Sequence, residues 1–410
     1  MAGVGDVGMQ LCAANVPYGL AKIHHVQEAM GGPADATFVG APDATVTRND
    51  RRWSQGFGYG GMYSWTGDFA VLDLKPNACG MSAGVLSERP ELDDIRARLH
   101  QLEREPLSLD GVRLDNDFCE SNHFVDVFRV SGDSEYRSAP GGAEYMYIMH
   151  SSGHEHRQTS PFGPGLYWDK SQQLMALARR FDTPWGSLHI LEAEHAEEWY
   201  RFYQQVQDFN HRRRALLGRF LFGDHEVVIN ATHQGMVQAH NRANIGCYTF
   251  TTTNQAAGQT AGSDPDASDD RESPTLSWDQ LFPLTLSPVL PAYLVLGQAN
   301  FGDVAIEQLG WRERIERHGL YERIAGQNIL PHGGGYNYPH LRGVTRVLED
   351  RDGRRRFELA PADTGVAPTV VETPRELSYA YRGMEVRERM EELGLGTAVI
   401  ELQLEYVATA

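Results

Sequence analysis

One cysteine and four histidines are the side chains in this sequence with the clearest capacity for chemistry. Each ends an apolar run or lies beside glycine, where a side chain can be held in a fixed direction. A thiolate with several imidazoles is a ligand set for a transition metal such as zinc or manganese. One such histidine alone is more often a structural residue, but the joint pattern favours a metal site. The five residues are Cys79, His123, His150, His233 and His332.

The order and local settings of these residues resemble the RtcB family of RNA ligases. That family joins an RNA 3′-phosphate or 2′,3′-cyclic phosphate to a 5′-hydroxyl, using GTP and manganese. Its members carry a CG-containing segment followed by NHF, HS, AHN and HGxG motifs. The matching segments here are Cys79-Gly80-Met81, Asn122-His123-Phe124, His150-Ser151, His233-Gln234 and His332-Gly333-Gly334-Gly335.

The resemblance implies a role for each matching residue. Cys79 would bridge two Mn²⁺ ions, and His332 would attack GTP to form a histidine–GMP intermediate. The three other histidines, His123, His150 and His233, would complete the metal shells. The nucleotide contacts expected on the same ground are Asn122, Asp126, Gln234, Arg242, Gly333, Gly334 and Tyr381, with Tyr379 as the alternative to Tyr381.

The sequence departs from the family pattern in two places that bear on the chemistry. The family has a metal-binding aspartate three residues before the cysteine, where this chain has Pro76. We expect Asp73 to replace it as a ligand, with Asn77 as the alternative. The family's C-terminal lysine near the guanine is also missing. Two other functions therefore remain open: a metal-dependent phosphoesterase or cyclic-phosphate hydrolase, and a non-catalytic protein that binds RNA ends.

The composition is that of a globular protein. The chain has 410 residues, of which 41% are hydrophobic, and no basic-then-apolar export signal precedes it. The four cysteines show neither a CxxC pair nor a regular spacing, which favours reduced thiols in the cytoplasm. From the resemblance we expect one α+β domain over residues 1–410, with packed mixed and antiparallel sheets around a central metal-binding cleft. Its role would be RNA repair or tRNA splicing, with no membrane partner and any activating protein unknown.

Periodicity predicts several elements. Apolar residues three and four positions apart indicate helices at 90–105, 171–181 and 192–220, the last with a stripe of aromatic residues. β-Branched and aromatic runs indicate strands at 123–130, 144–150, 226–231, 246–252 and 397–407. The first fifty residues show little periodicity and are interpreted as loops with short elements.

Charge predicts two surface features. Residues 253–276 are acidic and nearly free of apolar side chains, as is typical of a flexible insertion. The net charge of −18 argues against broad binding of nucleic acid, because phosphate affinity depends on basic contacts. A local basic channel for RNA stays compatible with that charge. Its candidates are Arg212–Arg214, Arg342, Arg346 and Arg354–Arg356, although such runs are more often solvated faces.

Overall fold

Helices and strands are interspersed along the described parts of the chain. The structure is a computed structural model and describes residues 1–118, 122–251, 276–350 and 353–408. Its mixture of helices with antiparallel sheets confirms the expected α+β class. Within these ranges, none of the helices combines the length and the apolar character needed to cross a membrane.

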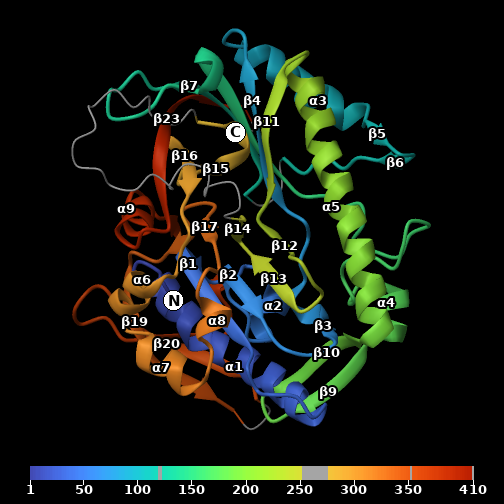
Figure 1. The fold of residues 1–410 in the computed structure, drawn as a ribbon, viewed down its shortest axis with the longest axis vertical. Coiled ribbons are helices and arrows are strands. Elements are labelled where there is room, and N and C mark those ends of the chain that lie inside the picture. Colours follow the sequence, from blue (N-terminus) through green and yellow to red (C-terminus); the bar gives the residue numbers. More distant parts are fainter. Residues whose placement is uncertain (119–121, 252–275, 351–352, 409–410) are drawn as a thin grey trace, which may run out of the picture.

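The largest sheet has seven strands, all paired antiparallel, and fills the upper part of Figure 1. Its two end strands, β11 and β15, also contact each other, so the sheet curls until it is almost closed. The strands, in spatial order, are β11 (Glu226–Thr232), β4 (Gly80–Leu86), β8 (Tyr145–Ser151), β7 (Phe124–Val130), β23 (Gly396–Val407), β16 (Ala292–Gly297) and β15 (Leu281–Leu284).

A four-stranded sheet lies below the large one in Figure 1. Its order is β1 (Thr37–Thr45), β2 (Tyr59–Ser64), β13 (Arg242–Ile245) and β12 (Gln234–Met236). Smaller groups complete the strands: β3 (Phe69–Val71), β10 (Gly186–Glu192) and β9 (Arg179–Thr183); β19 (Leu341–Glu349), β20 (Arg355–Pro361) and β21 (Thr369–Val371); and the pairs β14 (Cys247–Thr249) with β17 (Ile329–Pro331), β18 (Tyr336–Asn337) with β22 (Ala380–Tyr381), and β5 (Ser108–Leu109) with β6 (Val112–Arg113).

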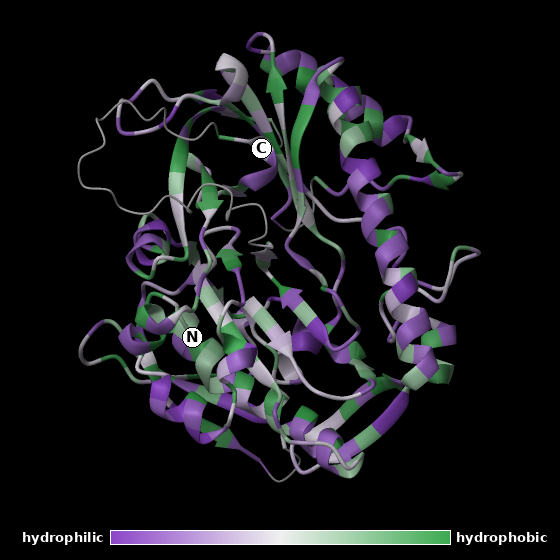
Figure 2. Cartoon of the chain, viewed as in Figure 1, coloured by the Kyte–Doolittle hydropathy of each residue, from purple (hydrophilic) through white to green (hydrophobic). Residues whose placement is uncertain are grey.

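The helices cover the outside of the sheets (Figure 1). Figure 2 shows hydrophobic residues concentrated on the inner strands, whereas peripheral helices such as α9 are largely hydrophilic. The helices are α1 (Val7–Ala29), α2 (Asp50–Ser54), α3 (Leu92–Arg104), α4 (Gln172–Leu177), α5 (Ala193–Phe222), α6 (Asp303–Gln308), α7 (Arg312–Arg317), α8 (Tyr321–Ile324) and α9 (Glu385–Glu392).

Helix α5 is the longest and runs along one side of both sheets (Figure 1). It buries the predicted aromatic stripe, including Trp199, Phe202 and Tyr203, against the strands. Gly223 follows it with a φ of 75°, a conformation that glycine adopts without strain and that ends a helix. The helix predicted at 192–220 is therefore confirmed, as is the one at 90–105, which is α3.

The prediction of loops over the first fifty residues is wrong. Helix α1 is 23 residues long and β1 follows it. The buried side chains lie on one face of α1, but this face includes the polar residues Asn15, Lys22 and Gln27, so its sequence lacks the apolar stripe that marks an amphipathic helix. Pro17 inside the helix also hides it from sequence rules, because proline normally ends a helix.

One predicted helix is shorter in the structure, and one predicted insertion lies largely outside the described residues. The helix expected at 171–181 ends at Leu177, and the chain enters β9 at Arg179. The acidic insertion predicted at 253–276 falls, apart from its final residue, outside the described residues. The five predicted strands are confirmed with shifts of one to three residues at their ends.

Candidate metal centre

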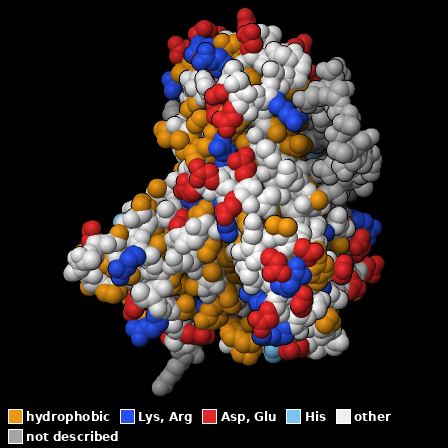
Figure 3. Space-filling model, turned by 60° about the vertical axis from the view of Figure 1, so that its left-hand side comes forward, with side chains coloured by type: hydrophobic (Ala, Val, Ile, Leu, Met, Phe, Trp, Pro, Cys, Tyr) orange, Lys and Arg blue, Asp and Glu red, His pale blue; other side chains and the backbone are white. Residues whose placement is uncertain are grey.

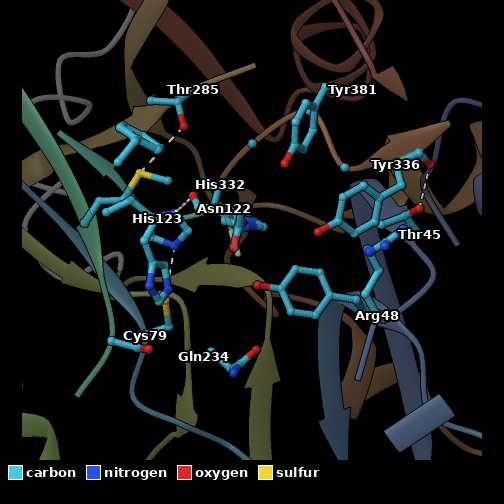
Figure 4. Close-up of a pocket in the computed structure, with 18 of the residues that line it drawn as sticks. Thr45, Arg48, Cys79, Asn122, His123, Gln234, Thr285, His332, Tyr336 and Tyr381 are labelled. Carbon is cyan, nitrogen blue, oxygen red and sulfur yellow. Dashed lines mark hydrogen bonds between the residues drawn. The ribbon is translucent and has the colours of Figure 1, made fainter. Parts of the chain in front are cut away.

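A cavity of about 910 Å³ opens between the two main sheets. The large sheet contributes side chains from β7, β8 and β23, and the four-stranded sheet contributes the end of β1 and the start of β12. Figure 4 shows Cys79 and His123 on one wall, with Arg48, Tyr336 and Tyr381 on the opposite wall. Residues more than 280 positions apart in the chain thus meet in one chamber.

Three histidines converge on Cys79 at the end of β4. The sulfur Sγ lies 3.1 Å from His150 Nε2 and 3.6 Å from His123 Nε2. His150 Nε2 also lies 3.2 Å from His233 Nε2. All four side chains are buried or nearly so, with Cys79 only 4% exposed. Of the four metal ligands expected from the sequence, Cys79, His123 and His150 therefore lie close enough to share one ion, and His233 adjoins this group through His150.

These separations match the edges of a metal-centred tetrahedron. With metal–nitrogen bonds of about 2.0–2.1 Å and metal–sulfur bonds of about 2.3 Å, tetrahedral geometry gives nitrogen–nitrogen edges of about 3.3 Å and sulfur–nitrogen edges of about 3.6 Å. The observed values of 3.2 Å and of 3.1 and 3.6 Å are within about half an ångström of these edges. Cys79, His123 and His150 could thus hold a metal ion.

In His150 and His123, the ring nitrogen on the side away from Cys79 is Nδ1, and its hydrogen bond shows that it carries a proton. His150 Nδ1 lies 2.9 Å from the carbonyl oxygen of Asn122, which only accepts, so Nδ1 carries the proton. His123 Nδ1 lies 3.0 Å from Asp117 Oδ2 and is protonated for the same reason. Nε2 is therefore the nitrogen that each of these two rings turns toward Cys79 Sγ. Such backing of the far ring nitrogen is typical of histidines that bind a metal.

The ionisation of these groups favours the same interpretation. Burial lowers the pKa of His150 and of His233, so both rings are neutral near pH 7. Burial alone favours a neutral thiol at Cys79, but the three surrounding histidines lower its pKa well below the usual range. His123 differs: burial opposes its protonation, but Cys79 and Asp117 raise its pKa to about 10. A metal ion must therefore displace the Nε2 proton of His123 before this ring can bind it together with the thiolate.

An ionic network behind the cluster holds His123, and no local sequence motif marks it. Asp117 is fully buried; besides His123, it accepts a hydrogen bond from the backbone N–H of Ser152 at 2.8 Å. Arg213, on α5, donates to Asp117 Oδ1 at 3.0 Å and to Glu155 Oε1 at 2.8 Å. Burial opposes its ionisation, but Arg213 and His123 hold the pKa of Asp117 far below its ordinary value.

Asp117 could itself be considered a ligand, because its carboxylate lies close to His123 and His154. Its oxygens are already engaged by Arg213, His123 and the Ser152 amide. A cation placed there would face the guanidinium of Arg213, which repels it. We therefore interpret Asp117 as the residue that orients His123.

Asp117→Asn should weaken metal binding by about 10- to 100-fold, the usual cost of losing a partner behind a ligand histidine. The amide keeps the shape of the side chain but removes the charge that stabilises the Nδ1–H tautomer of His123. Dissociation constants measured by competition with a chromogenic chelator check this. Asp115→Asn, at an exposed acid two residues away, is the matched control and should bind metal as the wild type does. Equal affinity in the two variants would contradict the orienting role.

His332 faces the cluster from the loop after β17. Its Nδ1 lies 2.8 Å from Asp43 Oδ2 and its backbone amide donates to the same oxygen at 3.2 Å. The carboxylate therefore places the proton on Nδ1 and leaves the Nε2 lone pair for the cavity that the ring lines. The ring centroid is 4.3 Å from that of His233 and 6.4 Å from that of His150.

The glycines after His332 lie where the structure has no room for a side chain. A Cβ at Gly334 would lie 2.6 Å from the carbonyl oxygens of Arg382 and Leu286, closer than real contacts allow. Gly335 has a φ of 67°, and a Cβ there would lie 2.6 Å from the carbonyl oxygen of Asp43. The loop therefore packs His332 against the strand that carries Asp43, with backbone rather than side chains at the contact.

Most of the expected nucleotide contacts line the same cavity. Gln234 follows His233 and donates to the side chain of Asn77, which in turn accepts a hydrogen bond from the amide of Cys79. Tyr381 lies on the opposite wall (Figure 4). The expected residues that line the cavity are Asn122, Asp126, Gln234, Gly333, Gly334 and Tyr381.

Asp126 is an unusual acid within this lining. It is 7% exposed, and its Oδ1 has no hydrogen-bond partner in the described part of the chain. Burial raises its pKa to about 7. A carboxyl that is neutral below pH 7 can donate a hydrogen bond, and above pH 7 it becomes an acceptor.

Asp126→Asn should stabilise the protein at pH 8 but not at pH 4. The ordinary pKa of an aspartate is about 3.9, so the unfolded chain releases this proton between about pH 4 and 7 while the folded protein keeps it. The contribution of Asp126 to stability therefore falls as the pH rises through this range. The amide avoids that loss, and we expect Tm to rise by about 3 °C at pH 8. Asp363→Asn, at an exposed acid, should leave Tm unchanged at both pH values.

Two expected residues lie elsewhere. Asp73 accepts hydrogen bonds from Trp168 Nε1 at 3.0 Å and from His189 Nδ1 at 3.0 Å, and it does not line the cavity. Arg242 also lies outside the lining and donates to Gln238 and to Gln327. The expectations for Asp73 as a metal ligand and for Arg242 as a phosphate contact are thus corrected. The stacked rings of Trp168 and His189 both present N–H groups to the Asp73 carboxylate, which explains why this acid lies there and not in the cavity.

Neither the models of known protein families nor the curated protein sequences contain a match to this chain.

Proposed function

We propose that this protein is a metal-dependent RNA ligase that joins RNA 3′-phosphate or 2′,3′-cyclic phosphate ends to 5′-hydroxyl ends through a histidine–GMP intermediate. The proposal is supported above all by the cluster of Cys79, His123 and His150, whose ligand atoms lie close enough to share one metal ion. His233 adjoins this cluster, and His332 lies beside His233. RNA repair and tRNA splicing are both compatible roles.

His332 is the nucleophile in this proposal. Its Nε2 attacks the α-phosphorus of GTP, an N–P bond forms, and the bond to the β-phosphate oxygen breaks to release pyrophosphate. Asp43 keeps the proton on Nδ1 and stabilises the positive charge that develops on the ring, as the carboxylate does in other histidine–aspartate pairs. Two bound Mn²⁺ ions would supply electrostatic stabilisation of the charge on the phosphate oxygens.

The RNA then replaces histidine as the carrier of GMP. An oxygen of its 3′-phosphate attacks the phosphorus, the N–P bond breaks, and His332 recovers its lone pair. The 5′-hydroxyl of the second strand next attacks the 3′-phosphate, loses its proton and displaces GMP. A 2′,3′-cyclic phosphate must first be opened by water to give the 3′-phosphate.

A phosphoesterase acting on cyclic phosphates is the second candidate. The position of Asp73 favours it, because that carboxylate is bound to Trp168 and His189 and leaves the cluster with four donors. Three of these donors, Cys79, His123 and His150, lie close enough to share one ion. Three protein ligands leave a coordination position for water, and one ion with a bound water suffices for hydrolysis. A third candidate is a protein that binds RNA ends without catalysis.

One labelling experiment separates the three candidates. The purified protein is incubated with Mn²⁺ and α-labelled GTP, and separately with ATP, before denaturation. An acid-labile, alkali-stable label on the protein is the result expected for the ligase. No label together with hydrolysis of a 2′,3′-cyclic phosphate would favour the phosphoesterase. Metal binding with neither reaction would favour the binding protein.

A further inference from the structure

The wall opposite the metal centre carries an arginine without a counterion. Arg48 follows β1 and lines the cavity (Figure 4). Its Nη1 is buried and has no hydrogen-bond partner, and the described residues give it no ion pair. The other arginines on this wall differ: Arg52 donates to the carbonyl oxygens of Leu74 and Lys75, and Arg375 pairs with Asp50 at 3.2 Å.

Tyrosines surround the free guanidinium. The Arg48 Cζ lies 4.6 Å from the ring centroid of Tyr379 and 5.9 Å from that of Tyr336. Tyr336 also meets Tyr379 edge-on, at 4.7 Å between centroids. Tyr379 is 40% exposed, so this corner, defined by Arg48, Tyr336 and Tyr379, lies at the mouth of the cavity. We call it the Arg48 corner.

The chemistry of the Arg48 corner suits a nucleotide unit. A guanidinium binds phosphate through paired N–H groups, and it does so best where it has no other partner. Tyrosine faces stack on nucleobases of any sequence, each worth about 1–3 kcal/mol by alanine substitution. Arginine beside aromatic rings at a cavity mouth is therefore an arrangement that single-stranded nucleic acid recognises.

The rest of the surface makes such a corner necessary for RNA. The molecule carries a net charge of −18, and on the face shown in Figure 3 the Lys and Arg side chains are scattered among acidic ones. Two predicted members of a basic channel, Arg213 and Arg214, are fully buried and unavailable to a ligand. Attraction for a phosphodiester chain must then come from single arginines inside the cavity.

A second arginine lies on the metal side of the cavity. Arg157 lines it, leaves its Nε without a partner in the described chain, and lies near His154, whose pKa it helps burial to lower. His154 in turn lies 5.8 Å from His123, between ring centroids. Positive charge is therefore present both near the cluster and at the mouth. A volume of about 910 Å³ also approaches the upper end of the range for one small ligand, roughly 300–1,000 Å³.

We infer that the Arg48 corner binds the RNA strand one nucleotide upstream of its reacting end, with the internal phosphodiester on Arg48 and the base against Tyr379. The terminal phosphate of the same strand lies at the metal centre, and the chain leaves the cavity past the exposed edge of Tyr379. This inference rests on the proposed function for the identity of the strand as RNA. It assigns the corner to the strand and not to the nucleotide that modifies His332.

The test is a set of binding titrations that requires no catalysis. Calorimetry in EDTA, and again with Mn²⁺, compares 3′-phosphorylated RNAs of one, two and four nucleotides with GTP. Arg48→Gln should weaken binding of the tetranucleotide about 10- to 100-fold and lower the slope of log affinity against log salt by about one. Binding of the mononucleotide and of GTP should change less than about twofold, because neither reaches the corner.

Three further variants complete the design. Arg48→Lys keeps the positive charge but loses the planar guanidinium group. Its affinity for the tetranucleotide should therefore lie between those of the wild type and of Arg48→Gln. Tyr379→Leu, at an exposed position, should weaken the tetranucleotide about tenfold and carries the test if Arg48→Gln fails to fold, as judged by its melting curve. Arg180→Gln is the matched control, since that arginine is exposed on β9, pairs with Asp182 and does not line the cavity, so its substitution should have no effect.

The outcomes are distinguishable from those of the proposed function. Unchanged tetranucleotide binding in Arg48→Gln and Tyr379→Leu would overturn the inference, as would an equal loss for GTP or the mononucleotide. Failure of the wild type to bind the tetranucleotide would overturn it too. Absence of a protein-bound label from GTP would overturn the ligase proposal alone, because binding in EDTA needs neither metal nor nucleotide transfer.

Discussion

His332→Ala should abolish the attachment of label from α-labelled GTP, with a loss on the order of 10³-fold or more. The ring is the group whose Nε2 lone pair faces the cavity, held by Asp43 at 2.8 Å from Nδ1. Removing the His332 ring takes away the nitrogen that forms the N–P bond. Among the described histidines, no other one both pairs with a carboxylate and lies beside His233 in this loop. Acid precipitation of the labelled protein, followed by counting, measures the effect.

His340→Ala is the matched control for this variant. His340 is exposed, lies eight residues further along the same segment and does not line the cavity. It should accept label as the wild type does. Label that persists in His332→Ala, provided that its melting curve and metal content match the wild type, would contradict the assignment of the nucleophile.

Cys79→Ser should lower the affinity for Mn²⁺ or Zn²⁺ more than about 100-fold. The thiolate is the only donor that lies within 3.6 Å of two of the histidine Nε2 atoms, and a serine hydroxyl stays protonated near pH 7. Metal content after dialysis, measured by atomic emission, should fall from the wild-type level to background. Label transfer should be lost with it.

Cys247→Ser provides the control for the thiol itself. Cys247 is also fully buried and free, but it lies on β14 outside the cavity, and burial raises the pKa of its thiol. Its variant should retain metal and activity. If both serine variants keep the metal, the cluster around Cys79 is not the binding site.

Local pattern was enough to predict much of this fold. Helix α5 was predictable because its aromatic stripe repeats every three or four residues along one continuous element. Strand β23 was predictable from its β-branched run. Helix α1 was not, because its buried face carries polar residues such as Lys22 and the helix contains Pro17, so neither periodicity nor breaker rules describe it.

The candidate site likewise contains residues that local sequence patterns could predict and residues that they could not. Cys79 and the four histidines could be predicted because each carries a local motif beside a strand or glycine turn. Asp117 and Asp43, which fix two of the rings, have no local signature, and they become partners only through pairings across the fold. The same limit explains Arg213: within a charge run it resembles a solvated residue, yet α5 turns it inward onto Asp117.

Anomalous scattering from crystals grown with Mn²⁺ tests the central claim most directly, because it locates the ion independently of any activity. The account predicts a peak within about 2.0–2.4 Å of Cys79 Sγ and His150 Nε2. It also predicts that His332 Nε2 faces the same chamber with Nδ1 still bound to Asp43. A peak elsewhere in the protein, no peak at saturating metal, or a His332 ring turned away from the chamber would contradict it.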